Sequence, residues 1–361
     1  MDAPDLPDLT HLVCAQAANL VALAPSEAIL KRTALTGGAS WLDVFFLAPG
    51  ILSQQDAPKA NNGEYPATAA MTTGYVFRVE NQATAAFLQR IGKTGHLTTL
   101  HVEQSSDLLH IDPLASFSYL AGIASTVFVT AALVRLGDHA ALAFVGTLMA
   151  ARALNVAVLK RRAAPGWKGM PEPGVQGDLL ILVSQDKWIR MRGPVDDIKS
   201  VTAGQWLQDM EPLDSFLASA ASLLVYGSIA FAWRASPLGS VLTAGLLALS
   251  ATLLGVCNSL TTKLRMYGCV VGKTDVKKYD RRLHMAEEVI TDRLRETLQQ
   301  DPGSPLDWDK HVEWAVRLGL INNHDELRKM MLKERHRDLA RALRLVDVED
   351  SKGEEGKGVI L

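Results

Sequence analysis

Residues 114–134 contain no charged side chain in 21 positions. An α-helix rises about 1.5 Å per residue, so a helix of this length crosses the roughly 30 Å hydrocarbon core of a bilayer. Residues 215–233 and a stretch within residues 235–262 meet the same requirement. Residues 140–159 meet it too, although they include Arg152, whose insertion costs about 2.5–3.5 kcal/mol before apolar neighbours offset it. The sequence therefore predicts an integral, multi-pass membrane protein.

Short connections predict how these four helices are joined. Residues 135–139 separate the first two runs, and residues 234–236 separate the last two, so each pair forms a tight helical hairpin. Basic side chains follow both hairpins, and short basic flanks mark the cytosolic face of a membrane. They are Lys160, Arg161, Arg162 and Lys168 after the first hairpin, and Lys263, Arg265, Lys273, Lys277, Lys278, Arg281 and Arg282 after the second. We therefore expect both termini and the central loop to be cytosolic.

The resulting fold class is mainly α, with a four-helix transmembrane bundle of two hairpins, a small α+β cytosolic loop and a helical cytosolic C-terminal region. The predicted divisions are a cytosolic N-terminal region at 1–112, the hairpins at 113–159 and 214–262, the loop at 160–213, the helical region at 263–349 and a disordered, charged tail at 350–361.

Residues 160–213 show the pattern of a small folded unit. Residues 179–184 form an apolar run, residues 185–187 suit a turn, and residues 188–192 alternate large apolar residues with arginine, which predicts a β-hairpin. Gly193 and Pro194 break this pattern and start an amphipathic helix. Beyond the last hairpin, apolar residues at helical spacing predict helices near 283–294 and 308–318, and a basic helix at 325–345.

Residues 182–207 and 313–321 carry a family resemblance. In these segments the chain is similar to a group of uncharacterised multi-pass membrane proteins of filamentous fungi, and the similarity extends roughly from the first membrane run to residue 321. The resemblance implies the same membrane topology. It implies no activity and no catalytic residue.

Few residues suggest chemistry within the membrane runs. Arg152 is the ionisable residue well inside a run, and Asn155 and Asn258 are candidate polar partners for it or contacts that join helices. The alternative for Arg152 is structural, because about 12 Å of helix separates it from Lys160 and its side chain can snorkel toward the interface. Cys269, which lies among basic residues after the last run, is a candidate lipidation site.

Recognisable catalytic motifs are missing from the sequence. The three cysteines form no Cys-x-x-Cys pair, the histidines lack ligand-like spacing, and residues 268–274 have one residue too few for a phosphate-binding loop. We therefore predict neither a metal nor another cofactor, and the net charge of −2 gives no reason to expect nucleic acid. The sequence leans against an enzyme and favours a scaffold or binding protein that acts through its cytosolic parts. An oligomeric channel or transporter, or a membrane-bound enzyme without a recognisable motif, are the alternatives.

Small residues recur every fourth position in three of the runs, which lets helices approach closely. They are Gly122 and Thr126 in the first, Gly146 and Ala150 in the second, and Ser240, Ala244, Ala248 and Thr252 in the fourth. These faces serve either packing within the chain or a homo-oligomer. The expected partners are thus the lipid bilayer and a protein. This protein is either a second copy of the same chain, in a homo-oligomer, or a different protein.

Overall fold

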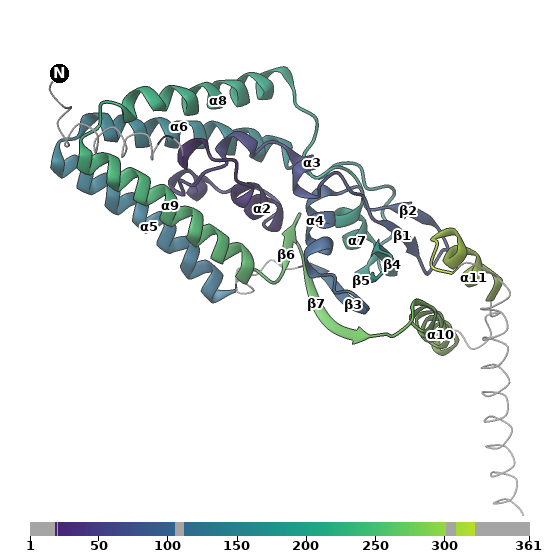
Figure 1. Ribbon diagram of the computed structural model, residues 1–361. Helices are drawn as coiled ribbons and strands as arrows, with labels where there is room; N and C mark the ends of the chain where they lie inside the picture. Colours follow the sequence, from purple (N-terminus) through teal and green to yellow (C-terminus); the bar gives the residue numbers. More distant parts are fainter. Residues whose placement is uncertain (1–18, 20, 105–111, 301–307, 322–361) are drawn as a thin grey trace, which may run out of the picture.

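The computed structural model describes residues 19, 21–104, 112–300 and 308–321 of the 361-residue chain. Four of its helices are long and apolar enough to cross a membrane. They are α5 (Pro113–Leu136), α6 (His139–Arg162), α8 (Pro212–Ala232) and α9 (Pro237–Leu260). All four extend from one side of an α+β domain, and both hairpin turns lie at the end farthest from that domain (Figure 1). The four predicted runs are therefore confirmed as long apolar helices.

Close helix packing crosses from one hairpin to the other. α6 packs along α8, and α5 packs along α9, whereas the helices joined by each short turn make fewer contacts. In the most apolar 18-residue stretch of each helix, 50% of α6 is buried, compared with 39% of α9, 28% of α5 and 22% of α8. α6 is therefore the most enclosed of the four. Residues from the N-terminal region lie between the two helix pairs (Figure 1). The structure therefore does not confirm a bundle in which four helices surround a common core.

The α+β domain contains a seven-stranded sheet in the order β2-β1-β4-β5-β3-β7-β6. Its strands come from three separate parts of the chain. They are β1 (Ala67–Ala70), β2 (Val76–Arg78), β3 (His96–Gln104), β4 (Gln176–Ser184), β5 (Lys187–Pro194), β6 (Leu264–Met266) and β7 (Cys269–Lys278). β3 and β5 are parallel, and the connection between them includes the hairpin of α5 and α6. The other pairs are antiparallel.

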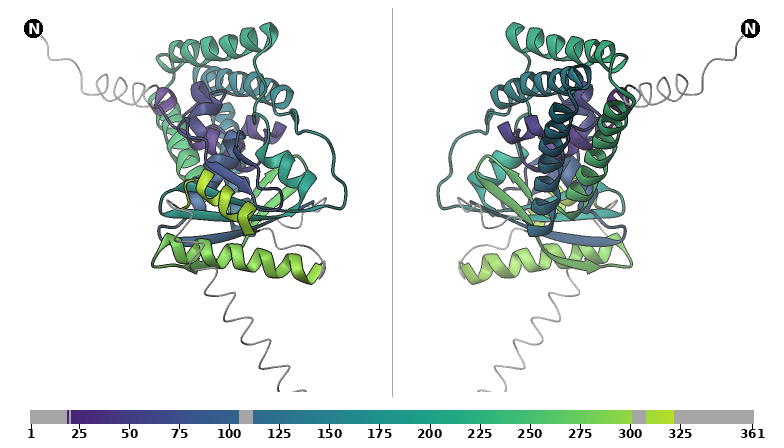
Figure 2. Two further views of the ribbon diagram at one scale, coloured as in Figure 1. Left: turned by 90° about the vertical axis from the view of Figure 1, so that its right-hand side faces the viewer. Right: turned by 90° about the vertical axis from the view of Figure 1, so that its left-hand side faces the viewer.

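Apolar residues point to both faces of this sheet, because successive side chains of a strand alternate. Leu179 and Ile181 belong to the core on the face toward the membrane helices, whereas Leu180 belongs to the core on the opposite face. The first face is covered by α2 (Ala28–Leu35), α3 (Ala57–Ala60), α4 (Gln82–Ile91) and α7 (Val195–Thr202). The second is covered by α10 (Arg282–Gln300) and α11 (Trp308–Arg317). Figure 2 shows the same layers from two sides.

The predicted central loop and C-terminal region meet different outcomes. β4 and β5 form the expected hairpin, and α7 follows it at the expected place. The expectation of helices throughout the region from 263 was wrong for residues 264–278, which form β6 and β7. α10 and α11 lie at the expected positions. The predicted helix at 325–345 and the tail at 350–361 lie outside the described residues.

Candidate functional site

Residues 28–55, which we call the N-terminal wedge, fill the space between the helix pairs. The wedge comprises α2 and two short 3-10 helices, η1 (Trp41–Phe45) and η2 (Ile51–Ser53). η1 packs against α5 and α6, η2 against α6 and α8, and α2 against α9. Every membrane helix therefore contacts the wedge, and polar groups of the wedge lie beside polar groups of the helices.

Arg152 faces the wedge and does not snorkel toward the interface. Its side chain is only 3% exposed, and its Nε donates to the carbonyl oxygen of Asp43 at 3.2 Å. The carboxylate of Asp43 accepts from the hydroxyl of Tyr119 on α5 at 2.5 Å and from the backbone N–H of Ser40 at 2.8 Å. Arg152, Asp43 and Tyr119 thus form a buried polar cluster. Asn155 and Asn258 were the candidate partners in the sequence, whereas the observed partner, Asp43, lies outside the membrane runs.

Asn155 and Asn258 contact the same wedge but do not contact Arg152 in the described structure. Gln55 donates to the backbone and side-chain oxygens of Asn155 at 3.0 and 3.1 Å, and Asn155 Nδ2 lies 3.4 Å from the carbonyl oxygen of Ile51. Asn258 Nδ2 donates to the carbonyl oxygen of Ala28 at 2.8 Å. Both asparagines therefore donate to backbone carbonyl groups of the wedge.

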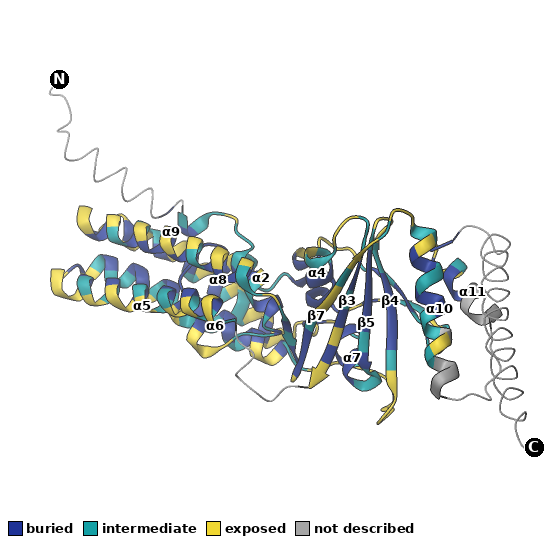
Figure 3. Ribbon diagram, turned by 90° about the horizontal axis from the view of Figure 1, so that it is seen from below, coloured by how far each residue is buried: buried dark blue, intermediate teal, exposed yellow. Residues whose placement is uncertain are grey.

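The outer side of the wedge resembles the outer surface of the membrane helices. Trp41, Leu42 and Phe45 are 55%, 51% and 39% exposed, and large apolar side chains are exposed on α5 and α9 as well. Figure 3 shows exposed residues along both of these helices. The ammonium of Lys160, at the end of α6, lies 6.0 Å from the centre of the Trp41 ring. An aromatic ring with a basic neighbour is typical of the membrane–water interface. The wedge thus presents apolar side chains to the surroundings, and toward the helices it presents both buried apolar residues, such as Phe46 and Leu47, and the polar groups of Asp43 and Gln55.

Two of the predicted small-residue faces differ in how they are used. A methyl group at Gly122 would come within 2.2 Å of the ring of Phe46, which belongs to the wedge and stacks on Tyr119. A methyl group at Gly146 would meet no atom within 4 Å. The face of Gly122 therefore serves packing within the chain, whereas that of Gly146 remains open on the surface.

The two hairpin turns are joined by Asp138. Its carboxylate caps α6 by accepting from the N–H of Ala141 at 2.9 Å. The same group accepts from the N–H and the hydroxyl of Ser236, at 2.8 and 2.6 Å, in the turn between α8 and α9. Burial works to raise the pKa of Asp138, but these hydrogen bonds outweigh it and the pKa is lowered. The carboxylate therefore remains charged and holds the far ends of the hairpins together.

Cys269 lies at the start of β7, where its side chain is 3% exposed. Its Sγ is 3.5 Å from the hydroxyl of Ser200 on α7, and burial raises the pKa of the thiol. Acylation needs an accessible and reactive thiolate. This environment disfavours the predicted lipidation at Cys269.

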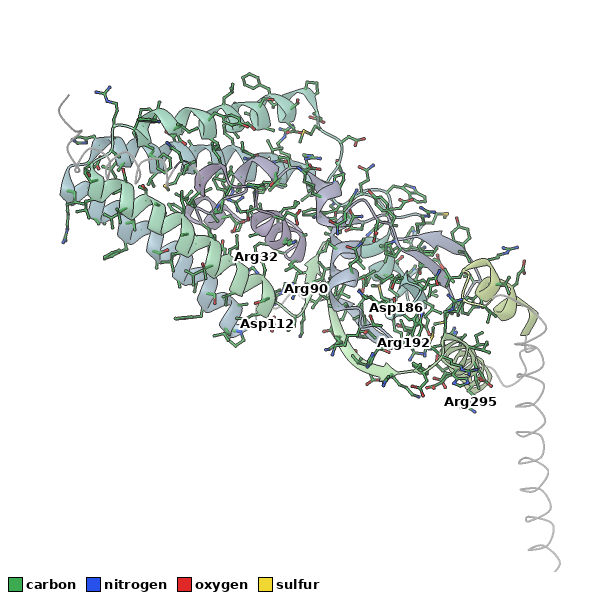
Figure 4. All side chains as sticks on the ribbon, in the orientation of Figure 1. Arg32, Arg90, Asp112, Asp186, Arg192 and Arg295 are labelled. Atoms are coloured by element: carbon green, nitrogen blue, oxygen red, sulfur yellow. The ribbon has the colours of Figure 1, made fainter. Side chains whose placement is uncertain are left out.

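A cavity of about 380 Å³ lies where the wedge, α4 and the end of α9 meet. Alanine and other apolar side chains form its floor, namely Ala34, Leu35, Ala60, Ala83, Ala86 and Phe87. Lys31, Arg90, Asn258 and Ser259 complete the lining. Figure 4 shows Arg90 at the junction of the helices with the α+β domain, near Asp112. We call this cavity the junction pocket.

Arg90 is held at the pocket by the end of α9. Its Nη2 donates to the carbonyl oxygen of Thr261, and the nearby Arg32 donates to the hydroxyl of Thr261 at 3.2 Å. Burial lowers the pKa of Arg90, and the charge of Asp112 opposes this shift. Because a guanidinium has five N–H groups, Arg90 retains donors for a further acceptor. This site was not predictable from the sequence, because its lining residues come from four separate elements, α2, α3, α4 and α9.

A second group of charges fastens α10 to the sheet. Arg190 binds Asp178 through two nitrogens, with its closest contact at 2.6 Å. Arg192 lies 3.4 Å from Asp178 and also donates to Glu296 of α10. Burial works to raise the pKa of Glu296, but the hydrogen bond and charge of Arg192, with Arg190 and Arg293, outweigh it and lower the pKa. Figure 4 places Arg192 between the sheet and α10. These mutually paired charges are suited to attachment of a helix.

Comparison with protein-family models, with curated proteins and with solved structures found no match to this chain. The resemblance to membrane proteins of filamentous fungi therefore stays a prediction.

Proposed function

We propose that this chain is a membrane-anchored scaffold or binding protein whose α+β domain contacts a protein partner in the cytosol. The four apolar helices support membrane anchorage. The cytosolic orientation is supported by the basic residues that follow α6 and α9, since both segments lead into the α+β domain. All three parts of the chain that build the sheet then lie on one side of the membrane.

The observation that carries the proposal is the exposure of large apolar side chains in loop 163–175. Trp167 is 80% exposed and Met170 is 83% exposed. Tryptophan and methionine are enriched at protein interfaces, where they supply apolar contact area. Exposed side chains of this size in the central loop are therefore candidates for a partner contact.

Loop 163–175 is fastened to α7, which favours a preformed contact surface. Lys199 donates to the carbonyl oxygen of Met170 at 2.9 Å and forms an ion pair with Glu172. The N–H of Glu172 donates to the carboxylate of Asp196 at 2.8 Å. A preformed loop loses less conformational entropy on binding than a loop that must be ordered. α10 and α11, the other predicted contact surfaces, bury apolar residues against the sheet.

The alternatives receive less support from the same geometry. Among the residues that line the junction pocket, the ionisable side chains are the two cations Lys31 and Arg90, and general acid–base catalysis needs a proton donor or acceptor near neutral pH. A transport path needs polar groups that continue across the helices. Arg152, Asn155 and Asn258 instead bind the N-terminal wedge.

Site-specific photocrosslinking in native membranes tests the proposal. A photoreactive phenylalanine analogue at position 167 should form a discrete adduct with another protein. The matched control is position 75 in the same domain, where Tyr75 is 68% exposed. Met170→Asp should remove the adduct at 167 without changing protein abundance. The same pattern of adducts at both positions, or adducts with lipid alone at 167, would contradict a protein contact at this loop.

Glycosylation mapping tests the orientation separately. An acceptor site inserted at Gln185, in the turn between β4 and β5, should stay unmodified because the turn faces the cytosol. A modified site would reverse the topology while leaving the four membrane helices in place.

A further inference from the structure

We infer that the junction pocket binds an anionic glycerophospholipid from the bilayer, with one acyl chain on its alanine-rich floor and the phosphate between Lys31 and Arg90. This inference is independent of the protein contact proposed at loop 163–175. It depends on where the pocket lies, on the character of its floor and on the charges that line it.

The position of the pocket gives a lipid direct access. Asn258 and Ser259, in the last turn of α9, form part of its wall. Val256, three residues before Ser259 and thus on a neighbouring part of the same helix face, is 41% exposed. The apolar outer surface of α9 therefore leads to the pocket. A lipid at the end of this membrane helix can enter without crossing water.

The lining of the pocket matches an amphiphile. Ala34, Ala60, Ala83 and Ala86 are small and leave an apolar space backed by Phe87. The volume of about 380 Å³ lies within the range of pockets that hold small ligands, and it suits part of an acyl chain better than a whole lipid. The rest of the lipid would remain in the bilayer. Burying each CH₂ group gives a favourable transfer free energy, so the floor provides affinity without specificity.

The charges provide the specificity for an anion. Arg90 donates one hydrogen bond to Thr261, and its remaining N–H groups suit the oxygens of a phosphate. Lys31 lies one turn from Leu35 on α2 and is paired on the surface with Glu27 at 2.9 Å. Because this pair is exposed, water and salt screen it, and a phosphate can compete for the ammonium. Two cations beside an apolar floor discriminate an anionic lipid from a zwitterionic one.

Mass spectrometry of the intact full chain, released from nanodiscs with equal amounts of phosphatidylserine and phosphatidylcholine of the same acyl chains, tests this inference. We expect retained phosphatidylserine in excess over phosphatidylcholine. Since a basic residue near a membrane surface contributes roughly a fivefold change in affinity for an anionic lipid, Arg90→Gln and Lys31→Gln should each reduce the excess about fivefold. Lys93→Gln is the matched control, because Lys93 is exposed just beyond α4 and does not line the pocket.

A second variant tests the floor of the pocket. Ala86→Phe should abolish lipid retention while preserving both cations, since Ala86 is partly exposed and the added ring fills the cavity. If that variant fails to fold, Arg90→Gln still tests whether the pocket binds an anionic lipid, because Arg90 is exposed and its substitution is less disruptive. Equal retention of both lipids, or equal effects of Arg90→Gln and Lys93→Gln, would overturn the inference. Binding of soluble glycerophosphoserine as tightly as the lipid would show an anion site with no acyl-chain pocket and would overturn it as well. In either case crosslinking at position 167 would remain, which separates this outcome from a failure of the proposed function.

Discussion

Replacement of Arg152 by leucine is the most direct test of the buried polar cluster. The substitution removes the donor to the carbonyl of Asp43 and a positive charge that interacts with the buried carboxylate of that residue. Breaking a buried charge interaction by removing one partner typically costs about 3–5 kcal/mol. Leucine also recovers part of this loss, because Nη1 of Arg152 is buried without a hydrogen-bond partner in the described structure, and such a group costs about 1–3 kcal/mol. We therefore expect a net destabilisation of about 2 kcal/mol.

Denaturant titration of the full chain in mild detergent measures this change. A loss of about 2 kcal/mol corresponds to a roughly 30-fold change in the unfolding equilibrium constant at room temperature. Asp43→Asn should be destabilising alone, yet it should partly rescue Arg152→Leu, because it removes the carboxylate that lost its cation. For residues in contact, the double variant should deviate from additivity by about 0.5–3 kcal/mol. Two results would contradict a stabilising contact between the wedge and α6 at Arg152. One is a double variant whose loss of unfolding free energy equals the sum of the two single losses, and the other is an Arg152→Leu protein as stable as the parent.

Three further predictions follow from the packing. Gly122→Ala should be less stable than Gly146→Ala by about 1–3 kcal/mol, because only the former methyl group meets the ring of Phe46, and thermal unfolding of the two variants checks this difference. Asp138→Ala should cost about 2–3 kcal/mol by removing both the α6 cap and the link between the hairpin turns, measured in the same unfolding assay. The pKa of Glu296 is lowered in the folded state from its ordinary value of 4.5, so its contribution to stability is present above that pH and is lost as pH falls below it. The protection of the α10 amides, corrected for the intrinsic exchange rate at each pH, should therefore fall in acid, and Glu296→Gln should remove that pH dependence.

The membrane helices were predictable because their signal is local. Each is a continuous apolar run, and no partner elsewhere in the chain is needed to recognise it. The hairpin of β4 and β5 was also local, since Gln185 and Asp186 supply its turn and the flanking strands pair directly. β3 and β7 carry weaker patterns, and they form strands because each pairs with segments far away in the chain. Whether these two segments form strands therefore depends on pairing with distant parts of the chain, which the local sequence does not reveal.

The candidate site was less predictable for the same reason. The sequence identified Arg152, but its hydrogen-bond acceptor is 109 residues earlier, and Asn258 contacts a carbonyl 230 residues away. One signal was present: Asp43 is an acidic residue within an apolar segment, residues 41–52, that is too short to span a membrane. Asp43 and Arg152 are each an isolated charged residue in an apolar segment, and their opposite charges suggest that they pair. The junction pocket left no comparable signal, because its lining residues come from four separate elements.

The connectivity makes the membrane helices and the α+β domain depend on each other. β3 lies between β5 and β7, so the sheet is complete only when residues before α5, between α6 and α8, and after α9 come together. Leu159, near the end of α6, belongs to the same core as β4 and β5, and therefore the sheet packs directly on a membrane helix. The wedge enters this assembly from the N-terminal side, and its backbone carbonyl groups accept hydrogen bonds from Arg152, Asn155 and Asn258. A chain without the wedge would leave these three groups unpaired between apolar helices, where each unpaired polar group costs several kcal/mol. The wedge is thus as much a part of the helical structure as the four long apolar helices, although α2, η1 and η2 are each too short to cross a bilayer.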